Sequence, residues 1–377
     1  MAQAGGRGSP GEIFAVFARL GLTAFGGPAA HIALMEREAV ERRGWLSREG
    51  FLDLVGACNL LPGPSSTQVA MALGYRRRGW LGLLIAGVCF ILPASAATLA
   101  LAWAYVRYGS LPQAQGLLYG AKPVMVAIVA QAIWKLGRMA WRSWGLALAG
   151  LACFGAVLAG VPAFGVLLVA GAVALAAAWG STRGPVSLSV AALPLGLGGA
   201  GLAAGLGAVF LVFLKLGVVV FGSGYVLLAF LKADLVDRLH WITEAQLLDA
   251  VTAGQLTPGP VFATATFVGY LVHGWAGAGA ATLGIFLPSF GMAGLVGALA
   301  GRVRRSRLAA GFLDGVNAAA VALMAAVGLA LCRGALVDGV AWAIGLASAL
   351  VLVRWKVNAT WLIVGGAGIG ILVHGLR

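Results

Sequence analysis

Two stretches of the chain follow the same plan and are equally long. Residues 17–64 read FARLGLTAFGGPAAHIALMEREAVERRGWLSREGFLDLVGACNLLPGP, and residues 213–260 read FLKLGVVVFGSGYVLLAFLKADLVDRLHWITEAQLLDAVTAGQLTPGP. Each stretch places a cation inside an apolar run, continues with a Gly-rich interruption and a charged segment containing tryptophan, and ends in Pro-Gly-Pro. A segment this unusual, written twice, predicts two copies of one structural unit.

The two copies stay aligned beyond the quoted stretches. After a slip of one residue, Gly74-Tyr75 matches Gly269-Tyr270, RGW at 78–80 matches HGW at 273–275, and Leu92-Pro93 matches Leu287-Pro288. We therefore predict an N-terminal repeat over residues 1–185 and a C-terminal repeat over residues 207–377. The Gly-rich run Val186–Leu206 between them is either an extra transmembrane helix or a linker on one side of the membrane.

The composition places both repeats in a lipid bilayer. The chain is 61% hydrophobic and 10% charged, whereas soluble domains carry about 25% charged residues. Long continuous apolar runs predict helices, because a helix needs about 20 apolar residues to cross the hydrocarbon core, and they lack the alternation of a β-barrel. We count thirteen such runs, which predicts an all-α polytopic membrane protein with about 12–13 transmembrane segments.

The net charge of +14 does not indicate a nucleic-acid partner, because the basic residues are spread over short loops between apolar runs. Their distribution predicts the membrane topology instead. Lys and Arg gather on cytoplasmic loops. Basic and non-basic loops alternate in both halves, but the alternation is shifted by one loop in the second half. Equivalent loops then lie on opposite sides, which predicts two inverted repeats in the cytoplasmic (inner) membrane, an architecture of many secondary transporters.

The Gly- and Pro-rich interruptions predict broken or re-entrant half-helices in the membrane. Glycine allows backbone conformations that a helix does not, and proline suits the first turn of a new helix. Half-helix N-termini present free N–H groups and a partial positive charge, which bind oxyanions; simple kinks relieved by neighbouring helices are the alternative. The substrate-binding candidates from these interruptions are Gly26, Gly27, Pro28, Gly63, Ser65, Ser66, Gly222, Ser223, Gly224 and Gly259.

Matching cations indicate the sign of the ligand. Arg19 and Lys215 stand inside apolar runs about two turns before each Gly interruption. A cation in the hydrocarbon region costs about 3 kcal/mol, so it needs a partner or a wet cavity; snorkelling to the nearby surface is the alternative. Asn59 and Gln255 match one turn before each Pro-Gly-Pro and are predicted to line the same substrate site. The matching Asp53 and Asp249 are interpreted as capping or loop partners rather than proton carriers.

At these residues the sequence resembles the chromate ion transporter family in its long two-domain form. The resemblance is carried by FxxLGxxxFGGP, by GWL after an acidic and basic helix, by LLPGP, and by the echoes FGSG and TPGP in the second half. It covers nearly the whole chain. It implies export of chromate from the cytoplasm, hence chromate resistance, with sulfate as a competing mimic, and it implies neither enzymatic chemistry nor a cofactor.

The sequence leaves three aspects of function open: the driving force, the distinction between a chromate transporter and an anion channel or another oxyanion transporter, and the assembly. Alternating access could be driven by the membrane potential, with or without proton coupling. An anion channel, or a transporter of sulfate or another oxyanion, would share the same cavity. The predicted partners are the oxyanion and the lipid bilayer, with a homodimer as the candidate assembly. The sequence shows no metal-ligand cluster and no nucleophile–base pair, so neither a metal site nor an enzyme is predicted.

Overall fold

The computed structural model describes residues 8–141, 143–180, 205–221, 224, 226–303, 307–355 and 357–375, and these are largely helical. Almost all of the run Val186–Leu206 lies outside the described residues, so whether it crosses the membrane stays a prediction. The described chain resumes at Gly205, and Leu206 is already the first residue of a helix.

The first repeat begins with a helical hairpin around the FGGP interruption. Helix α1 (Pro10–Thr23) starts with Ser9 as its cap, and helix α2 (Gly27–Glu36) continues as a π-helix, η1 (Arg37–Arg42). The chain reverses between them, because Arg43 pairs with Glu12 near the outer end and His31 bonds to the Ala24 carbonyl at the tip. α1 has 14 residues, about 21 Å of helix, which is less than the thickness of a hydrocarbon core of about 30 Å.

A second hairpin follows around LLPGP. Helix α3 (Arg48–Cys58) is capped by Ser47, and helix α4 (Ser65–Tyr108) begins directly after the Pro-Gly-Pro. α4 itself turns sharply at Arg78 and Gly79, where Gly79 has φ 59°. Gly74 and Gly82 consequently lie in direct backbone contact. α4 is therefore a short first arm (residues 65–77), a tight turn and a long second arm (residues 80–108).

The second repeat reproduces this order. Its elements are α8 (Leu206–Val219), α9 (Val226–Leu231), the π-helix η2 (Lys232–Arg238), α10 (Glu244–Leu256), the 3-10 turn η3 (Val261–Ala263) and α11 (Thr264–Val303). α11 makes the same turn at His273 and Gly274, with Gly274 at φ 59°. The agreement of the two turns, on unlike residues at Arg78 and His273, confirms that RGW and HGW are structural equivalents.

Each repeat ends in one long helix and one hairpin of shorter helices. These are α5 (Pro112–Ala140), α6 (Trp144–Leu158) and α7 (Ala163–Gly180) in the first repeat, and α12 (Arg307–Ala335), α13 (Gly339–Trp355) and α14 (Ala359–Gly375) in the second. The hairpins are exchanged between repeats. Gly120 of α5 packs against Gly366 of α14, and Gly315 of α12 packs against Ala170 of α7. Small residues allow this close backbone approach in a membrane.

The thirteen apolar runs do not become thirteen long crossings. Among the described residues, four helices are long and apolar enough to span a bilayer, namely α4, α5, α11 and α12. The other apolar helices have 10–17 described residues in the searched ranges. The runs around FGGP and LLPGP are divided into separate helices at the interruptions, as the sequence predicted.

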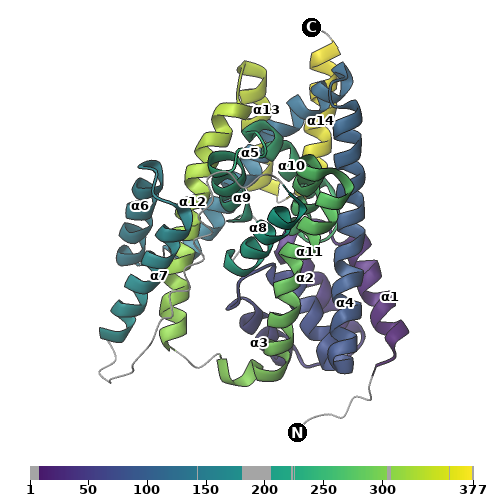
Figure 1. Cartoon of the computed structure of the whole chain (residues 1–377), viewed down its shortest axis with the longest axis vertical. Helices are drawn as coiled ribbons and strands as arrows, with labels where there is room; N and C mark the ends of the chain where they lie inside the picture. The colour runs from purple at the N-terminus through teal and green to yellow at the C-terminus, as the bar shows by residue number, and fades with distance from the viewer. Residues whose placement is uncertain are drawn as a thin grey trace.

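The two repeats run in opposite directions. Along the second arm of α4, Trp80 lies against Gly294 of α11, whereas Gly87, further along, lies against Phe290. The residue numbers rise on one helix as they fall on the other, so the two arms are antiparallel. Figure 1 shows α1–α3 in the lower part of the molecule with the N-terminus, and α9 and α10 in the upper part with the C-terminus. This arrangement agrees with the predicted inversion.

Candidate functional site at the crossing of the two repeats

The interruptions of the two repeats meet in the interior, and each binds the other repeat. The Gly63 N–H donates to the Val220 carbonyl at 2.6 Å, and the Gly259 N–H donates to the Ala24 carbonyl at 2.8 Å. A short antiparallel bridge between Pro62 and Phe221 accompanies the first bond. Each Pro-Gly-Pro loop is thus joined to the Gly interruption of the opposite repeat. We call these four loops (residues 24–26, 62–64, 220–221 and 257–260) the crossing.

The backbone at the crossing requires glycine. Gly26, Gly63 and Gly259 have φ of 103°, 105° and 90°, in the left-handed region that L side chains disfavour. Space is also limited, because a Cβ on Gly63 would stand 2.9 Å from Gln68 Nε2, and one on Gly259 would stand 2.8 Å from Ala94 Cβ. These glycines therefore fix how closely the two repeats approach.

Two half-helices begin at the crossing without side-chain caps. Four described helices away from the crossing start with Ser or Thr caps, among them Ser47 on α3 and Thr243 on α10. By contrast, α2 starts after Gly26 and α4 after Pro64, which have no side chain able to accept a hydrogen bond. The first N–H groups of a helix need partners. Uncapped N-termini of this kind are suited to an anion.

Several predicted polar residues lie beside these N-termini. Ser65 and Ser66 are buried in the first turn of α4. The Ser66 hydroxyl lies 3.3 Å from His31 Nδ1, and the other ring nitrogen of His31 lies 3.0 Å from the Ala24 carbonyl oxygen. His31 thereby connects the Gly interruption to the start of α4. Leu227 stands at the matching position in the second repeat, so the comparison of the two repeats did not identify His31 as a candidate site residue.

The remaining predicted residues are placed unequally. Gly27 is buried and Pro28 half-buried at the start of α2, while Gly224 is buried against Val261. Asn59 is exposed as the C-cap residue of α3, whereas its match Gln255 is 7% exposed. Gly222 and Ser223 lie outside the described residues. The matched positions 59 and 255 therefore differ in the structure, because only the second faces the packed interior.

Four buried polar atoms near the crossing have no hydrogen-bond partner among the described residues. They are Thr67 Oγ1, Gln68 Oε1, Gln255 Nε2 and Ser289 Oγ. Ser289 approaches the Pro-Gly-Pro loop, since its oxygen would lie 3.0 Å from a Cβ on Gly63. Buried polar groups are normally satisfied, so these atoms point to a missing partner. Sequence reasoning missed Ser289, although it directly follows the matched Leu-Pro at 287–288.

Both predicted cations have carboxylate partners that the sequence analysis did not identify. Arg19 forms an ion pair with Glu38, and Lys215 Nζ lies 2.8 Å from Asp234 Oδ2. Glu38 and Asp234 occupy matching positions inside the two π-helices. The pairing arises because each hairpin brings its returning arm alongside the first arm. The sequence analysis considered cations inside the apolar runs, whereas Glu38 and Asp234 lie in the charged segments that follow the Gly interruptions.

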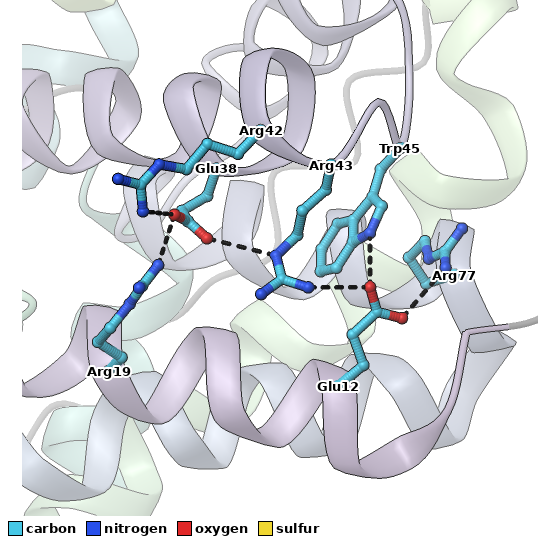
Figure 2. A network of polar contacts seen from close by, with 7 residues as sticks. All are labelled: Glu12, Arg19, Glu38, Arg42, Arg43, Trp45 and Arg77. Atoms are coloured by element: carbon cyan, nitrogen blue, oxygen red, sulfur yellow. Dashed lines mark hydrogen bonds and ion pairs between the residues drawn. The ribbon is translucent and has the colours of Figure 1, made fainter.

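The first repeat extends its ion pair into a network, shown in Figure 2. Glu38 also binds Arg42 at 2.9 Å and Arg43 at 3.3 Å. Arg43 continues to Glu12 at 3.1 Å, which accepts a hydrogen bond from the Trp45 indole and lies 3.3 Å from Arg77. α1, η1, the following loop and the first arm of α4 are thus tied together at one end of the hairpin.

Both ion-pair groups contain more cations than carboxylates. The first has four arginines on two glutamates, and the second has Lys215 and Arg238 on Asp234. Arg19 and Lys215 are therefore paired, but the groups around them remain positive. In the described ranges, no group of three His, Cys, Asp or Glu could hold a metal ion.

Comparison with known proteins gives one consistent family. The family model described as "Chromate transporter" matches residues 11–178 and 207–371, one part in each repeat. The chromate transport protein of Cupriavidus metallidurans is 31% identical over 97% of this chain and 93% of its own length. The chromate transport protein of Pseudomonas aeruginosa is 32% identical over 85% of this chain and 81% of its own length.

Other relatives match over a shorter range. The uncharacterized transporter YwrA of Bacillus subtilis is 33% identical over 33% of this chain and 70% of its own length. No solved structure matches the chain. The match in two parts agrees with the repeat, and the long apolar helices agree with a multi-pass protein of the cytoplasmic membrane. The chain belongs to the chromate transporter family, a family of transporters and not of enzymes.

Proposed function

We propose that this protein exports chromate across the cytoplasmic membrane by alternating access, with sulfate as a competing mimic. The observation that carries the proposal is the reciprocal bonding at the crossing, Gly63 to Val220 and Gly259 to Ala24. Two inverted repeats that meet at unwound backbone near mid-membrane form the site arrangement of many secondary transporters.

The chemistry of the crossing suits a tetrahedral dianion. The uncapped starts of α2 and α4 offer backbone N–H groups, and the hydroxyls of Ser65, Ser66 and Ser289 and the Gln255 amide can donate as well. Four oxygen atoms carrying two negative charges accept hydrogen bonds from several directions. Donors that are fixed before binding require little reorganisation when the ion arrives.

The cations would act on the approach to this site. Arg19 is 49% exposed while it pairs with Glu38, and its group holds a surplus of positive charge. A surplus of this kind raises the local concentration of anions. Lys215 occupies the matching place on the opposite side. We infer that Arg19 serves the ion from one side of the membrane and Lys215 from the other.

The membrane potential alone can drive export. One charge moved through 100 mV gains about 2.3 kcal/mol, so a dianion leaving a negative interior gains about 4–5 kcal/mol. At about 1.4 kcal/mol for each factor of ten, this supports a gradient of about a thousandfold. The direct bonds across the crossing favour a transporter over a channel, because a channel needs a continuous open path.

Flux in proteoliposomes at a fixed membrane potential tests the proposal. We expect saturable chromate flux that sulfate inhibits, and a reduction of about tenfold or more in both Arg19→Ala and Lys215→Ala. Arg48→Ala is the control, because Arg48 is a 78% exposed surface arginine that pairs with Glu36. Wild-type flux in both site variants would refute the role of the cations, and absence of any oxyanion flux would refute the function. Unitary current steps in a planar bilayer would identify a channel instead.

A further inference from the structure

A buried carboxylate outside the crossing is held by groups from two other helices. Asp249 of α10 is 4% exposed. Lys122 of α5 places its Nζ 3.1 Å from Asp249 Oδ1, and Tyr105 of α4 donates its hydroxyl to Asp249 Oδ2 at 3.0 Å. The Tyr105 ring in turn packs on Phe267 of α11, with ring centroids 5.3 Å apart. This triad joins the second repeat's half-helix to two spanning helices of the first repeat.

The sequence repeats the aspartate of the triad but not its lysine and tyrosine. The positions that match Asp249, Lys122 and Tyr105 are Asp53, Asn317 and Ala300, and Asp53 is exposed. The first repeat therefore builds the same hairpin with an exposed aspartate where the second repeat has a buried one. A buried ion pair is in any case weak evidence for stability, because removing both charges from water costs as much as their attraction returns. An ionisable group kept inside a membrane protein instead suggests a functional role.

Two side chains of neighbouring helices interact with Asp249. The titratable groups on the other elements packed around α10 are Tyr270, His273 and Arg302 of α11, Lys232, Asp234, Asp237 and Arg238 of η2, Arg307, Asp314, Cys332 and Arg333 of α12, and His374 of α14. Among the described side chains, only Lys122 and Tyr105 interact with Asp249. Lys122 is 21% exposed, whereas Asp249 is 4% exposed, so Lys122 is the more accessible member of the pair.

The position of the triad links it to the crossing. Thr98 of α4 lies 3.2 Å from Thr257 at the crossing, and Tyr105 is two turns further along the same helix, about 10 Å away. On the other side, α10 carries Asp249 and leads directly into the loop 257–260. The Lys122–Asp249 pair therefore fastens a half-helix that forms the crossing to the spanning helices α4 and α5.

We propose that Asp249 is the proton-binding site that couples oxyanion transport to proton movement; this inference rests on the proposed function. In one state the carboxylate is ionised and paired with Lys122. A proton from the outer aqueous phase then adds to the carboxylate and gives the neutral acid, while Lys122 keeps its own proton and charge. The neutral acid no longer holds α10 against α5, so the half-helix is free to move with the crossing. The proton leaves Asp249 to the cytoplasm when the pair re-forms.

The experiment measures chromate flux and proton movement together. Proteoliposomes with a pH-sensitive dye inside are clamped at zero potential with potassium and valinomycin, and chromate is the probe. We expect the wild-type protein to move protons opposite to chromate, and Asp249→Asn to lose this movement and the response to an imposed pH gradient. Asp53→Asn is the matched control, because it changes the same repeat position at an exposed site, and it should keep the coupling.

A second variant decides the case if Asp249→Asn carries no flux. Tyr105→Phe removes one hydrogen bond to the ionised carboxylate and so favours the protonated form. It should shift the pH of half-maximal flux upward by about one unit, since a bond to a charged group is worth about that much. Chromate flux without proton movement in the wild-type protein, unchanged coupling in Asp249→Asn, or no pH shift in Tyr105→Phe would overturn the inference. Absence of chromate flux in the wild-type protein would refute the proposed function instead.

Discussion

The hairpins α1–η1 and α8–η2 share one ion pair and differ in the rest of their charges. Both place a cation of the first arm on a carboxylate in the π-helix of the returning arm, Arg19 on Glu38 and Lys215 on Asp234. Among the ion pairs of the described residues, the first hairpin continues this pair to a second carboxylate, Glu12, and Ala208 stands at the matching position in the second. The shared pair belongs to the repeated unit, and the extension distinguishes the two sides of the membrane.

This difference indicates that the first hairpin is held more rigidly than the second. The first is tied at its outer end through Arg43, Glu12 and Arg77 to the first arm of α4 (Figure 2). In the second, Lys215 and Arg238 pair with Asp234, and Asp249 of α10 pairs with Lys122 of α5. We expect the second hairpin to be the more mobile of the two during transport.

The largest effect should come from the feature that is the same in both repeats. Gly63→Ala and Gly259→Ala each place a methyl group at positive φ, which costs about 1–2 kcal/mol, and each adds a steric clash at the crossing. We expect chromate flux to fall by about tenfold or more in both variants. Flux in proteoliposomes at equal protein content is the measurement.

Gly56→Ala provides the matched control for the crossing variants. Gly56 lies in helix α3 with open space around its Cα, so alanine should leave flux near the wild-type level. A loss in only one of the two crossing variants would show that the two loops are not functionally equivalent. Wild-type flux in both would contradict a substrate site at the crossing.

A smaller effect should separate the two ion-pair groups. Glu38→Gln leaves Arg19, Arg42 and Arg43 without a common carboxylate, whereas Asp234→Asn affects Lys215 and Arg238. Because the arginines are partly exposed, we discount the cost of breaking a buried pair and expect about 2 kcal/mol of destabilisation for Glu38→Gln and about 1 kcal/mol for Asp234→Asn. Thermal unfolding in detergent measures both. A reversed order would contradict the firmer first hairpin.

The smallest effect concerns the hydrogen bond that exists at one end only. Trp45→Phe removes the indole N–H that donates to Glu12 at 3.1 Å, and we expect a loss of about 0.5–1 kcal/mol because the acceptor is partly exposed. The matching Trp241→Phe should cost less, because Ala208 provides no carboxylate there. The comparison uses the same unfolding assay, and equal losses would show that indole packing rather than the Glu12 bond is decisive.

Much of the architecture could be predicted from repeated residue types. Glycine and proline restrict the backbone locally, so the interruptions at FGGP and at both Pro-Gly-Pro sequences could be located without a structure. The shifted alternation of basic loops indicated the inversion. The number of crossings stays a prediction, because a run of apolar residues shows that a segment lies in lipid but does not show whether the chain continues or reverses after a break.

The candidate site was predicted only in part for the same reason. Arg19 and Lys215 stand out as cations in apolar runs, but their partners Glu38 and Asp234 lie far along the chain and become neighbours only through the reversal of the hairpin. Ser289 and His31 have no like residue in the other repeat, so the repeat comparison gave no signal for them. Asp249 matches Asp53 in sequence and differs from it in burial, which depends on what packs against each helix.

The amino-acid sequence by itself determined that the chain lies in lipid, that it contains a repeat, and where its helices are interrupted. Hydropathy, residue identity and local backbone preference are properties of short segments, so they can be read without the tertiary structure. Only the tertiary structure decided that Gly63 bonds to Val220 and Gly259 to Ala24, which carboxylate each cation meets, and that one of two matching aspartates is buried beside a lysine. These are contacts between segments distant in the chain, and their energies depend on the geometry with which the two repeats pack.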